Sequence, residues 1–169
     1  MEELVIVTGA RDSGKTTLLN AYCSYLVSKG FRLGGIVCSA PLPGQEKTDW
    51  IVNNLATGES RLLMSLASHP GWEKKGRFHI NTSVFSWANS CIVASFTATD
   101  YLVFDEIGKF EIDGYGYSSA FSEALRTYPG IIIAVIRDTL LNQVANAFSI
   151  NLSQGRFLQA GIPPDRQGL

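Results

Sequence analysis

The eight residues from Gly9 to Thr16 read GARDSGKT and match the pattern G-x-x-x-x-G-K-[ST], whose backbone amides cradle phosphate groups. They follow the apolar run Leu4–Val7 and lead into a helix-forming stretch that begins at Thr17. In this context successive N–H groups and the positive end of a helix point at one anion. We therefore interpret the loop as a binding site for a nucleoside triphosphate, in preference to a chance glycine-bearing turn.

The side chains of this loop have separate expected roles. Lys15 is expected to reach the β- and γ-phosphates, and the Thr16 hydroxyl to bind Mg²⁺. The side chain of Arg11 either touches the nucleotide or points to solvent, and we favour solvent because the pattern leaves this position variable. The residues predicted to bind the nucleotide are Gly9, Ala10, Arg11, Asp12, Ser13, Gly14, Lys15, Thr16 and Thr17.

Two carboxylates come directly after a later apolar run. Asp105 and Glu106 follow Tyr101–Phe104. In P-loop enzymes an acidic residue at this place completes the Mg²⁺ shell, and a neighbouring carboxylate can hold the attacking water and accept its proton. We interpret Asp105 as the magnesium-side residue and Glu106 as the water-orienting base, in preference to two solvated acids at the end of a strand.

A lysine lies close behind these acids. Lys109 either offers positive charge to the γ-phosphate or pairs with Glu111 at the surface, and spacing alone does not separate the two. Gly108 would let the backbone turn closely past the nucleotide.

The elements that must position these residues alternate between strand and helix. Strands are expected at Leu4–Val7, Leu33–Cys38, Arg77–Asn81, Tyr101–Phe104 and Ile131–Ile136, with a hairpin formed by Asp49–Leu55 and Arg61–Leu66. Helices are expected over Gly14–Lys29, from an N-cap at Ser83 through Ser95, from Ser118 or Ser119 to Tyr128, and after an N-cap at Asp138. This alternation predicts an α/β fold with a mainly parallel sheet, made mixed by the hairpin and covered by helices on both faces.

Two segments lack such patterns. Ala40–Lys47 is polar and contains proline, so we expect an exposed loop there. The tail beyond Asn151 is rich in glycine, proline and glutamine, and it is placed only weakly.

Composition limits the class of protein. The 169 residues predict a single domain, 1–169, and 46% hydrophobic with 17% charged residues is typical of a globular chain. With 14 basic and 15 acidic residues, the charge gives no support for a broad nucleic-acid surface. No apolar run approaches the ~20 residues that a membrane span needs.

The cysteines and the first residues bear on location. Cys23, Cys38 and Cys91 share no spacing of the kind that binds metal, so we expect reduced thiols. The acidic start, Met1–Glu3, is unlike a secretory signal. Both observations favour the cytoplasm.

The stretch Asp105–Glu111, DEIGKFE, resembles the D-E-I-G-K-M-E motif of a family of small nucleoside-triphosphatases first described in thermophiles, which includes a vertebrate cancer-related member. Other pieces align in the same order. Gly35 begins a strand that resembles the family's G-F-Y-T element, Asn54–Glu59 resembles its D-L-A-T-G-E turn, and Gly76–Asn81 resembles its G-R-Y-V-V-N/D strand, with an aromatic following at Phe85. The similarity extends from about Leu4 to Ile136.

This resemblance implies a P-loop fold of the RecA-like kind. It also implies slow, Mg²⁺-dependent hydrolysis of ATP, GTP and other nucleoside triphosphates to diphosphate and phosphate, and it strengthens the assignment of Lys109 to the site. The expected catalytic residues are therefore Lys15, Glu106 and Lys109, and the expected metal-side residues are Thr16 and Asp105.

The chain departs from the family pattern in several places. Phe110 replaces a methionine, which alters packing more than chemistry, and Ile36–Ser39 lacks the usual aromatic and threonine. An arginine-bearing segment has no counterpart near Val144–Ser149, which would cost orders of magnitude in rate if that arginine assists the transition state. Arg137 either substitutes for it or forms a surface ion pair, the commoner role. The family's final strand is not recognisable after Asn151.

Two other functions remain open. A nucleotide or small-metabolite kinase would share the phosphate loop but would usually need an arginine-rich lid, and arginines are few after Arg77. A nucleotide-dependent adaptor with little turnover would act through a protein partner that the sequence does not identify.

Overall fold

A mixed sheet of nine strands runs through the computed structural model, which describes residues 4–39 and 44–162. The strands are β1 (Leu4–Gly9), β2 (Leu33–Cys38), β3 (Asp49–Asn54), β4 (Ser60–Ser65), β5 (Glu73–Lys75), β6 (Phe78–Ile80), β7 (Tyr101–Phe104), β8 (Ile131–Arg137) and β9 (Arg156–Gln159). The helices are α1 (Lys15–Ser28), α2 (Thr82–Ala94), α3 (Lys109–Ile112), α4 (Ser118–Thr127) and α5 (Leu141–Ala147), with short 3₁₀ turns at Asp138–Leu140 and Leu152–Gln154.

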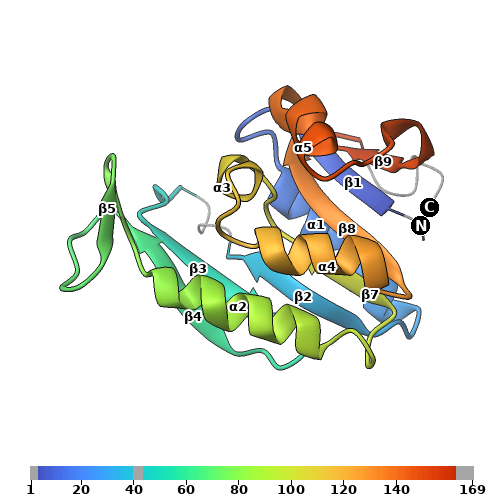
Figure 1. Ribbon diagram of the computed structural model, residues 1–169, viewed down its shortest axis with the longest axis horizontal. Helices are drawn as coiled ribbons and strands as arrows, with labels where there is room; N and C mark the ends of the chain where they lie inside the picture. Colours follow the sequence, from blue (N-terminus) through green and yellow to red (C-terminus); the bar gives the residue numbers. More distant parts are fainter. Residues whose placement is uncertain (1–3, 40–43, 163–169) are drawn as a thin grey trace.

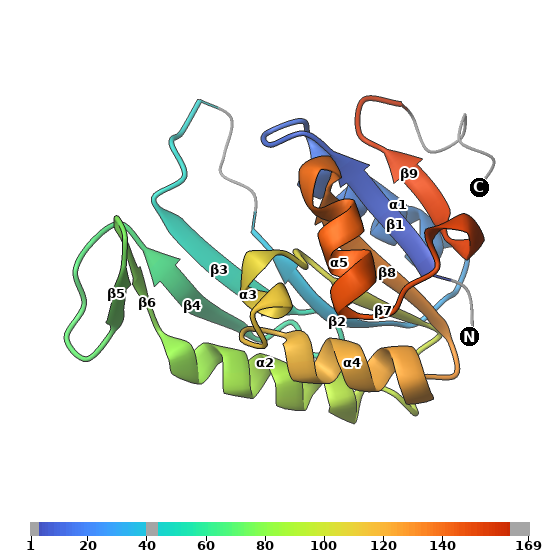
Figure 2. The same cartoon turned by 45° about the horizontal axis from the view of Figure 1, so that its top comes forward.

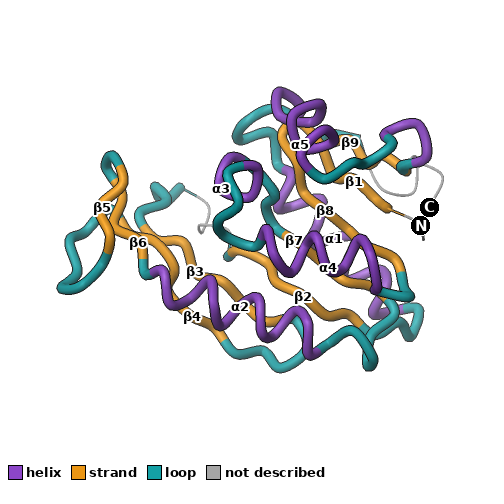
Figure 3. The backbone as a smooth tube through the Cα atoms, in the orientation of Figure 1, coloured by secondary structure: helices purple, strands orange, loops and turns teal. Residues whose placement is uncertain are grey.

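The sheet has a parallel half and an antiparallel half. Strands β2, β7, β8, β1 and β9 lie side by side in that order and pair in parallel. Strands β3, β4, β6 and β5 continue the sheet in antiparallel pairs and extend away from the parallel half (Figure 3). This confirms the predicted α/β fold with a hairpin addition. Because parallel strands share one direction, the loops after β1, β2, β7 and β8 all leave from the same edge.

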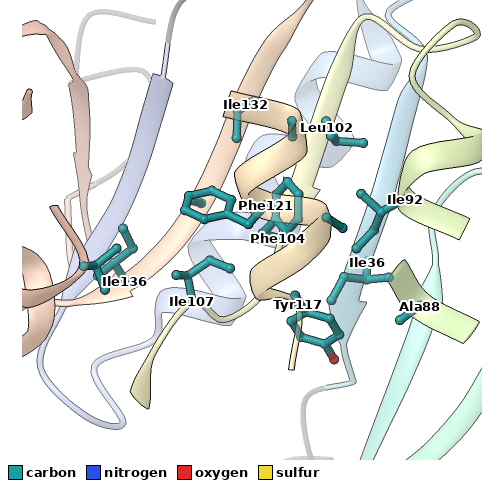
Figure 4. Close-up of a cluster of buried hydrophobic side chains, with 14 of the residues drawn as sticks. Ile36, Ala88, Ile92, Leu102, Phe104, Ile107, Tyr117, Phe121, Ile132 and Ile136 are labelled. Atoms are coloured by element: carbon teal, nitrogen blue, oxygen red, sulfur yellow. The ribbon is translucent and has the colours of Figure 1, made fainter. Parts of the chain in front are cut away.

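Helices cover both faces of the sheet, as predicted. Helix α1 packs on one face, while α2, α4 and α5 cover the other (Figures 1 and 2). On the second face Phe104 of β7 meets Phe121 of α4 edge to face, with ring centroids 5.0 Å apart, and neither side chain is accessible to solvent (Figure 4). Full burial stabilises the fold by roughly 1.5–3 kcal/mol for each such side chain.

Two predicted helix starts differ from the structure. Helix α2 begins at Thr82 with Asn81 at the N-cap position, so Ser83 lies inside the helix and its hydroxyl donates to Asn81 Oδ1 (2.7 Å). The segment after β8 opens with a 3₁₀ turn that contains Asp138, and the α-helix proper begins only at Leu141. Asp138 and Ser83 were both plausible caps by residue type, but the chain enters each helix at a different residue.

Three short elements were not predicted. Strand β5 and helix α3 contain three and four residues, too few to show a periodic pattern. Strand β9 pairs in parallel with β1, so the tail does form a final edge strand, and only Leu158 among its four residues is buried. The loop predicted at Ala40–Lys47 lies partly outside the described residues. From Gly44 to Lys47 the chain is a turn followed by irregular structure.

Gly35 is required where β2 approaches β7. Its φ is +90°, and a Cβ atom there would overlap the Val103 carbonyl oxygen and come within 2.6 Å of the Val103 nitrogen. We predict that Gly35→Ala lowers the free energy of unfolding by about 3 kcal/mol or more, because backbone on both sides must move. Chemical denaturation of the purified variant measures this.

Gly58 provides the matched control, since its φ is +76° but a Cβ atom would meet nothing within 4 Å. Gly58→Ala should cost only about 1 kcal/mol, from backbone strain alone. Equal losses in the two variants would show that crowding against β7 is not what requires Gly35.

Candidate active site

The phosphate-type loop lies between β1 and α1, as the sequence predicted. Gly14 occupies the N-cap position of α1 with φ +89°, a left-handed conformation that glycine adopts without strain. Ala10, Arg11, Asp12 and Ser13 are exposed, and Arg11 forms a solvent-exposed contact with Asp12 at 3.6 Å. Such an exposed pair contributes little to stability. The exposed Arg11 side chain agrees with the prediction that it faces solvent.

Lys15 is the buried cation of this loop. It is the first residue of α1, and its side chain is largely removed from solvent. Its ammonium donates to the Ala10 carbonyl oxygen at 2.5 Å, so the lysine lies back over its own loop. The Ala10 carbonyl is the one hydrogen-bond partner of this ammonium among residues 4–39 and 44–162, so the buried charge is only partly compensated.

Asp105 lies at the end of β7, beside β2. Its Oδ2 accepts a hydrogen bond from the Cys38 backbone N–H at 3.0 Å, and only 3% of the residue is exposed. Burial raises the pKa of Asp105 to about 6, while the Cys38 N–H and the positive charges of Lys47 and Lys15 oppose the rise. Strand β8 pairs with both β1 and β7, so the fold brings the loop after β1 and this acid to the same edge of the sheet.

The oxygens at this place suit a magnesium ion. Of the two carboxylate oxygens of Asp105, Oδ2 accepts the Cys38 hydrogen bond, whereas Oδ1 has no hydrogen-bond partner among the described residues. Oδ1 is therefore available to a bound water or cation. Thr16, half-buried in the first turn of α1, adds a hydroxyl oxygen. A hydroxyl and a carboxylate, completed by water and phosphate oxygens, are the donors that Mg²⁺ prefers.

Glu106 is paired with Arg137. The Nε atom of Arg137, the last residue of β8, lies 2.7 Å from Oε1 of Glu106. Arg137 is itself in register with Gly9, the first residue of the phosphate-type loop. The sequence favoured a surface ion pair for Arg137. The structure confirms an ion pair and identifies its partner as the predicted water-orienting base.

The environment of Glu111 excludes one of the two roles predicted for Lys109. Glu111 is buried, and its carboxylate accepts from the Gly108 and Tyr117 backbone amides at 2.9 and 3.0 Å. The alternative that Lys109 pairs with Glu111 at the surface is therefore wrong, because these amides hold the carboxylate inside the fold. Lys109 is exposed at the start of α3, and its contact with a nucleotide stays a prediction.

Tyr117 is a site neighbour that the sequence did not indicate. It is 3% exposed, and no hydrogen-bond partner of its hydroxyl is found among the described residues. The hydroxyl points out of the apolar cluster (Figure 4). Burial raises the pKa of Tyr117, and Cys38, Glu111 and Asp105 are near enough to add to the rise. No local pattern indicates this role, because Cys38 and Asp105 are brought to Tyr117 from β2 and from the end of β7.

Burial of Asp105 predicts a pH-dependent stability. The folded-state pKa of about 6 exceeds the ordinary value of 3.8, so the folded chain binds the proton more tightly than the unfolded chain. Stability from this group is present below the unfolded pKa and is lost as pH rises through 6. Asp105→Asn should therefore stabilise the nucleotide-free protein by up to about 3 kcal/mol at pH 7.5 and by about a third of that at pH 4.5.

Urea unfolding without nucleotide or Mg²⁺ at the two pH values measures this difference. The exposed Asp113 at the end of α3 supplies the control, and Asp113→Asn should change stability little at either pH. Destabilisation by Asp105→Asn at both pH values would mean that its partners favour the ionised form in the folded protein.

Known proteins resemble this chain in sequence and in fold. The profile of a family described as NTPase matches residues 4–155. The nucleoside-triphosphatase THEP1 of Methanothermobacter thermautotrophicus is 29% identical over 137 residues, covering 80% of this chain and 78% of that protein. The THEP1 of Methanosarcina acetivorans is 27% identical over 146 residues, covering 85% and 81%.

Two solved structures share the fold. The crystal structure of THEP1 from Aquifex aeolicus superposes with a TM-score of 0.68 at 16% identity, covering 98% of this chain and 93% of that chain. The solution structure of a human cancer-related nucleoside triphosphatase gives 0.70 at 21% identity, covering 99% and 93%. The profile spans nearly the whole described chain, and this protein therefore belongs to the NTPase family of nucleoside-triphosphatases.

Proposed function

We propose that this protein hydrolyses nucleoside triphosphates to diphosphate and phosphate with Mg²⁺, using Lys15, Thr16, Asp105 and Glu106. The observation that carries this proposal is the meeting of two separate segments at one edge of the sheet. Strand β8 pairs with β1 on one side and with β7 on the other, so the loop after β1 and the acids after β7 flank the same strand. Hydrolysis at the γ-phosphate requires a loop that binds the phosphates and carboxylates beside it that bind the metal and the water.

The residues of the chain have distinct tasks in this mechanism. The loop amides, the N-terminal end of α1 and the Lys15 ammonium would hold the β- and γ-phosphates and stabilise negative charge as it develops. Thr16 and Asp105 would hold Mg²⁺, which supplies further positive charge to the phosphate oxygens. Glu106 would orient a water and accept its proton while the water oxygen bonds to the γ-phosphorus and the bond to the diphosphate breaks.

This arrangement favours broad use of nucleotides. The proposed contacts all go to phosphate and metal, so they do not distinguish ATP from GTP or the pyrimidine nucleotides. Lys109 would add charge near the γ-phosphate from the start of α3. We infer slow turnover from the family resemblance.

A location in the cytoplasm is supported by the cysteines. Cys23, Cys38 and Cys91 are free thiols, and burial raises the pKa of Cys23 and Cys38 to about 12, which keeps them protonated and unreactive. Within residues 4–39 and 44–162, no helix has both the length and the apolar character to cross a bilayer.

The proposal predicts different losses in two variants. Lys15→Ala should weaken binding of the triphosphate and abolish phosphate release, because the buried cation is lost. Glu106→Gln should leave binding near the wild-type level but lower kcat by about 10²–10⁴-fold, since the amide cannot accept the water proton. Phosphate release from ATP, GTP, CTP and UTP with Mg²⁺ measures turnover, and calorimetry with a non-hydrolysable analogue measures binding.

Matched controls are available away from the proposed site. Lys29 at the end of α1 and Glu123 on α4 lie outside the proposed site, and Lys29→Ala and Glu123→Gln should behave as wild type. Unchanged turnover in Glu106→Gln beside an inactive Lys15→Ala would contradict the role of Glu106. Phosphate transfer only in the presence of an acceptor would indicate a kinase, and tight binding without turnover would indicate an adaptor.

A further inference from the structure

Arg137 makes the one recorded side-chain contact of Glu106 among the described residues. Its Nε atom lies 2.7 Å from the Glu106 Oε1 atom, within the range of strong charge-assisted contacts. The Nε atom is inaccessible to solvent, and no well-aligned hydrogen bond from it is found within the described part of the chain. The contact is therefore ionic, and the buried Nε side of the guanidinium faces the Glu106 carboxylate.

Regular backbone positions bring these two residues together. Arg137 ends β8 directly opposite Gly9 of β1, and on the other side Ala134 of β8 pairs with Phe104 of β7. Beyond Phe104 the chain stays attached to β8, because the Ile107 N–H donates to the Val135 carbonyl oxygen at 2.8 Å. Glu106 thus lies between two points where its backbone is held against β8, and Arg137 extends from that same strand.

Stability alone does not account for this pair. The Arg137 and Glu106 side chains keep 42% and 29% of their surface exposed. Solvent screens pairs of this kind, and most contribute less than about 1 kcal/mol. The stronger consequence is positional, because the short ionic contact holds the Glu106 carboxylate close to the end of β8.

We infer that Arg137 is a positioning residue that holds the Glu106 carboxylate in the direction needed to orient the attacking water. This inference rests on the proposed role of Glu106 in hydrolysis. Without Arg137 the carboxylate would sample several rotamers, and each turnover would require it to return to one of them. Losing such a supporting partner typically costs 10–100-fold in activity.

A double-mutant cycle tests this inference, because a residue that acts only through Glu106 has no effect once Glu106 is disabled. Arg137→Ala and Arg137→Gln should each lower kcat for ATP by about 10–100-fold. The same changes made in the Glu106→Gln protein should lower kcat no further than about twofold. Arg137→Lys should recover part of the loss, since it keeps the charge but not the planar fork.

Two further readouts separate positioning from other roles. Affinity for a non-hydrolysable ATP analogue, measured by calorimetry with Mg²⁺, should be unchanged in Arg137→Ala, and the thermal midpoint should shift by only a few degrees. Arg32 is the matched control, because it forms an ion pair with Asp100 at 2.9 Å far from the proposed site. Arg32 directly precedes β2 and Asp100 directly precedes β7, whereas the site lies where these strands end. Arg32→Ala removes a comparable ion pair and should leave kcat unchanged.

Several outcomes would overturn the inference. Losses from Arg137→Ala and Glu106→Gln that multiply in the double variant would show that Arg137 acts independently, for instance on the phosphoryl group itself. A weakened affinity for the analogue would show that Arg137 holds the nucleotide. A wild-type kcat in both Arg137→Ala and Arg137→Gln would show that Glu106 needs no support.

The proposed function fails in a different way. If the wild-type protein releases no phosphate, or if Glu106→Gln alone leaves kcat unchanged, the role of Glu106 is wrong. If wild type hydrolyses ATP and Glu106→Gln is impaired while the Arg137 variants are not, only the positioning role is wrong.

Discussion

The parallel register that joins β8 to both β1 and β7 is the constraint on which the candidate site depends. It places Gly9 opposite Arg137 and Phe104 opposite Ala134, so that the loop after β1, the end of β8 and the acids after β7 leave the sheet together. Strand β2, paired with β7, adds the Cys38 amide that holds Asp105. A slip of one residue in either pairing would turn the inward side chains to the opposite face of the sheet and separate these groups.

The packing beneath this edge keeps the register. Ile107, directly after the two acids, is fully buried in the same apolar cluster as Phe121 (Figure 4), and its amide is bonded to β8. A few residues later the buried carboxylate of Glu111 ties the Gly108 and Tyr117 amides together. The burial of Ile107 and the hydrogen bonds of Glu111 therefore fix the segment that follows the two acids, which limits how far the acids can move.

Charge makes the same edge costly for the folded state. Asp105 is buried and its pKa is raised, and within the described part of the chain the buried Lys15 has no carboxylate in ion-pair contact. Groups that remain incompletely paired in this way are characteristic of sites that complete their interactions with a ligand. The replacement of the family methionine by Phe110 lies to one side of this chemistry, since its ring packs near Phe85 and beneath the Lys75 ammonium.

Local pattern was sufficient for much of this protein. The phosphate-type loop, its flanking strand and helix, and the acids after Tyr101–Phe104 could be predicted because each is a short segment with a distinctive order of residues. The main strands also showed in the sequence, since buried strands are continuous runs of apolar residues. The short elements β5, α3 and β9 were missed because, unlike the equally short β7, they contain no continuous apolar run.

The sequence by itself determined which residues could bind phosphate, metal and water, because these capacities belong to residue types and their spacing. Only the tertiary structure decided which of them meet. That Arg137 contacts Glu106 and that the Cys38 amide holds Asp105 follow from strand pairing between distant segments. That Glu111 is buried away from Lys109 follows from the bonds its carboxylate accepts from the Gly108 and Tyr117 amides. Such contacts join residues from 3 to 67 positions apart, and the longer ones leave no local signal, since strand order and register are settled by the burial of the whole core.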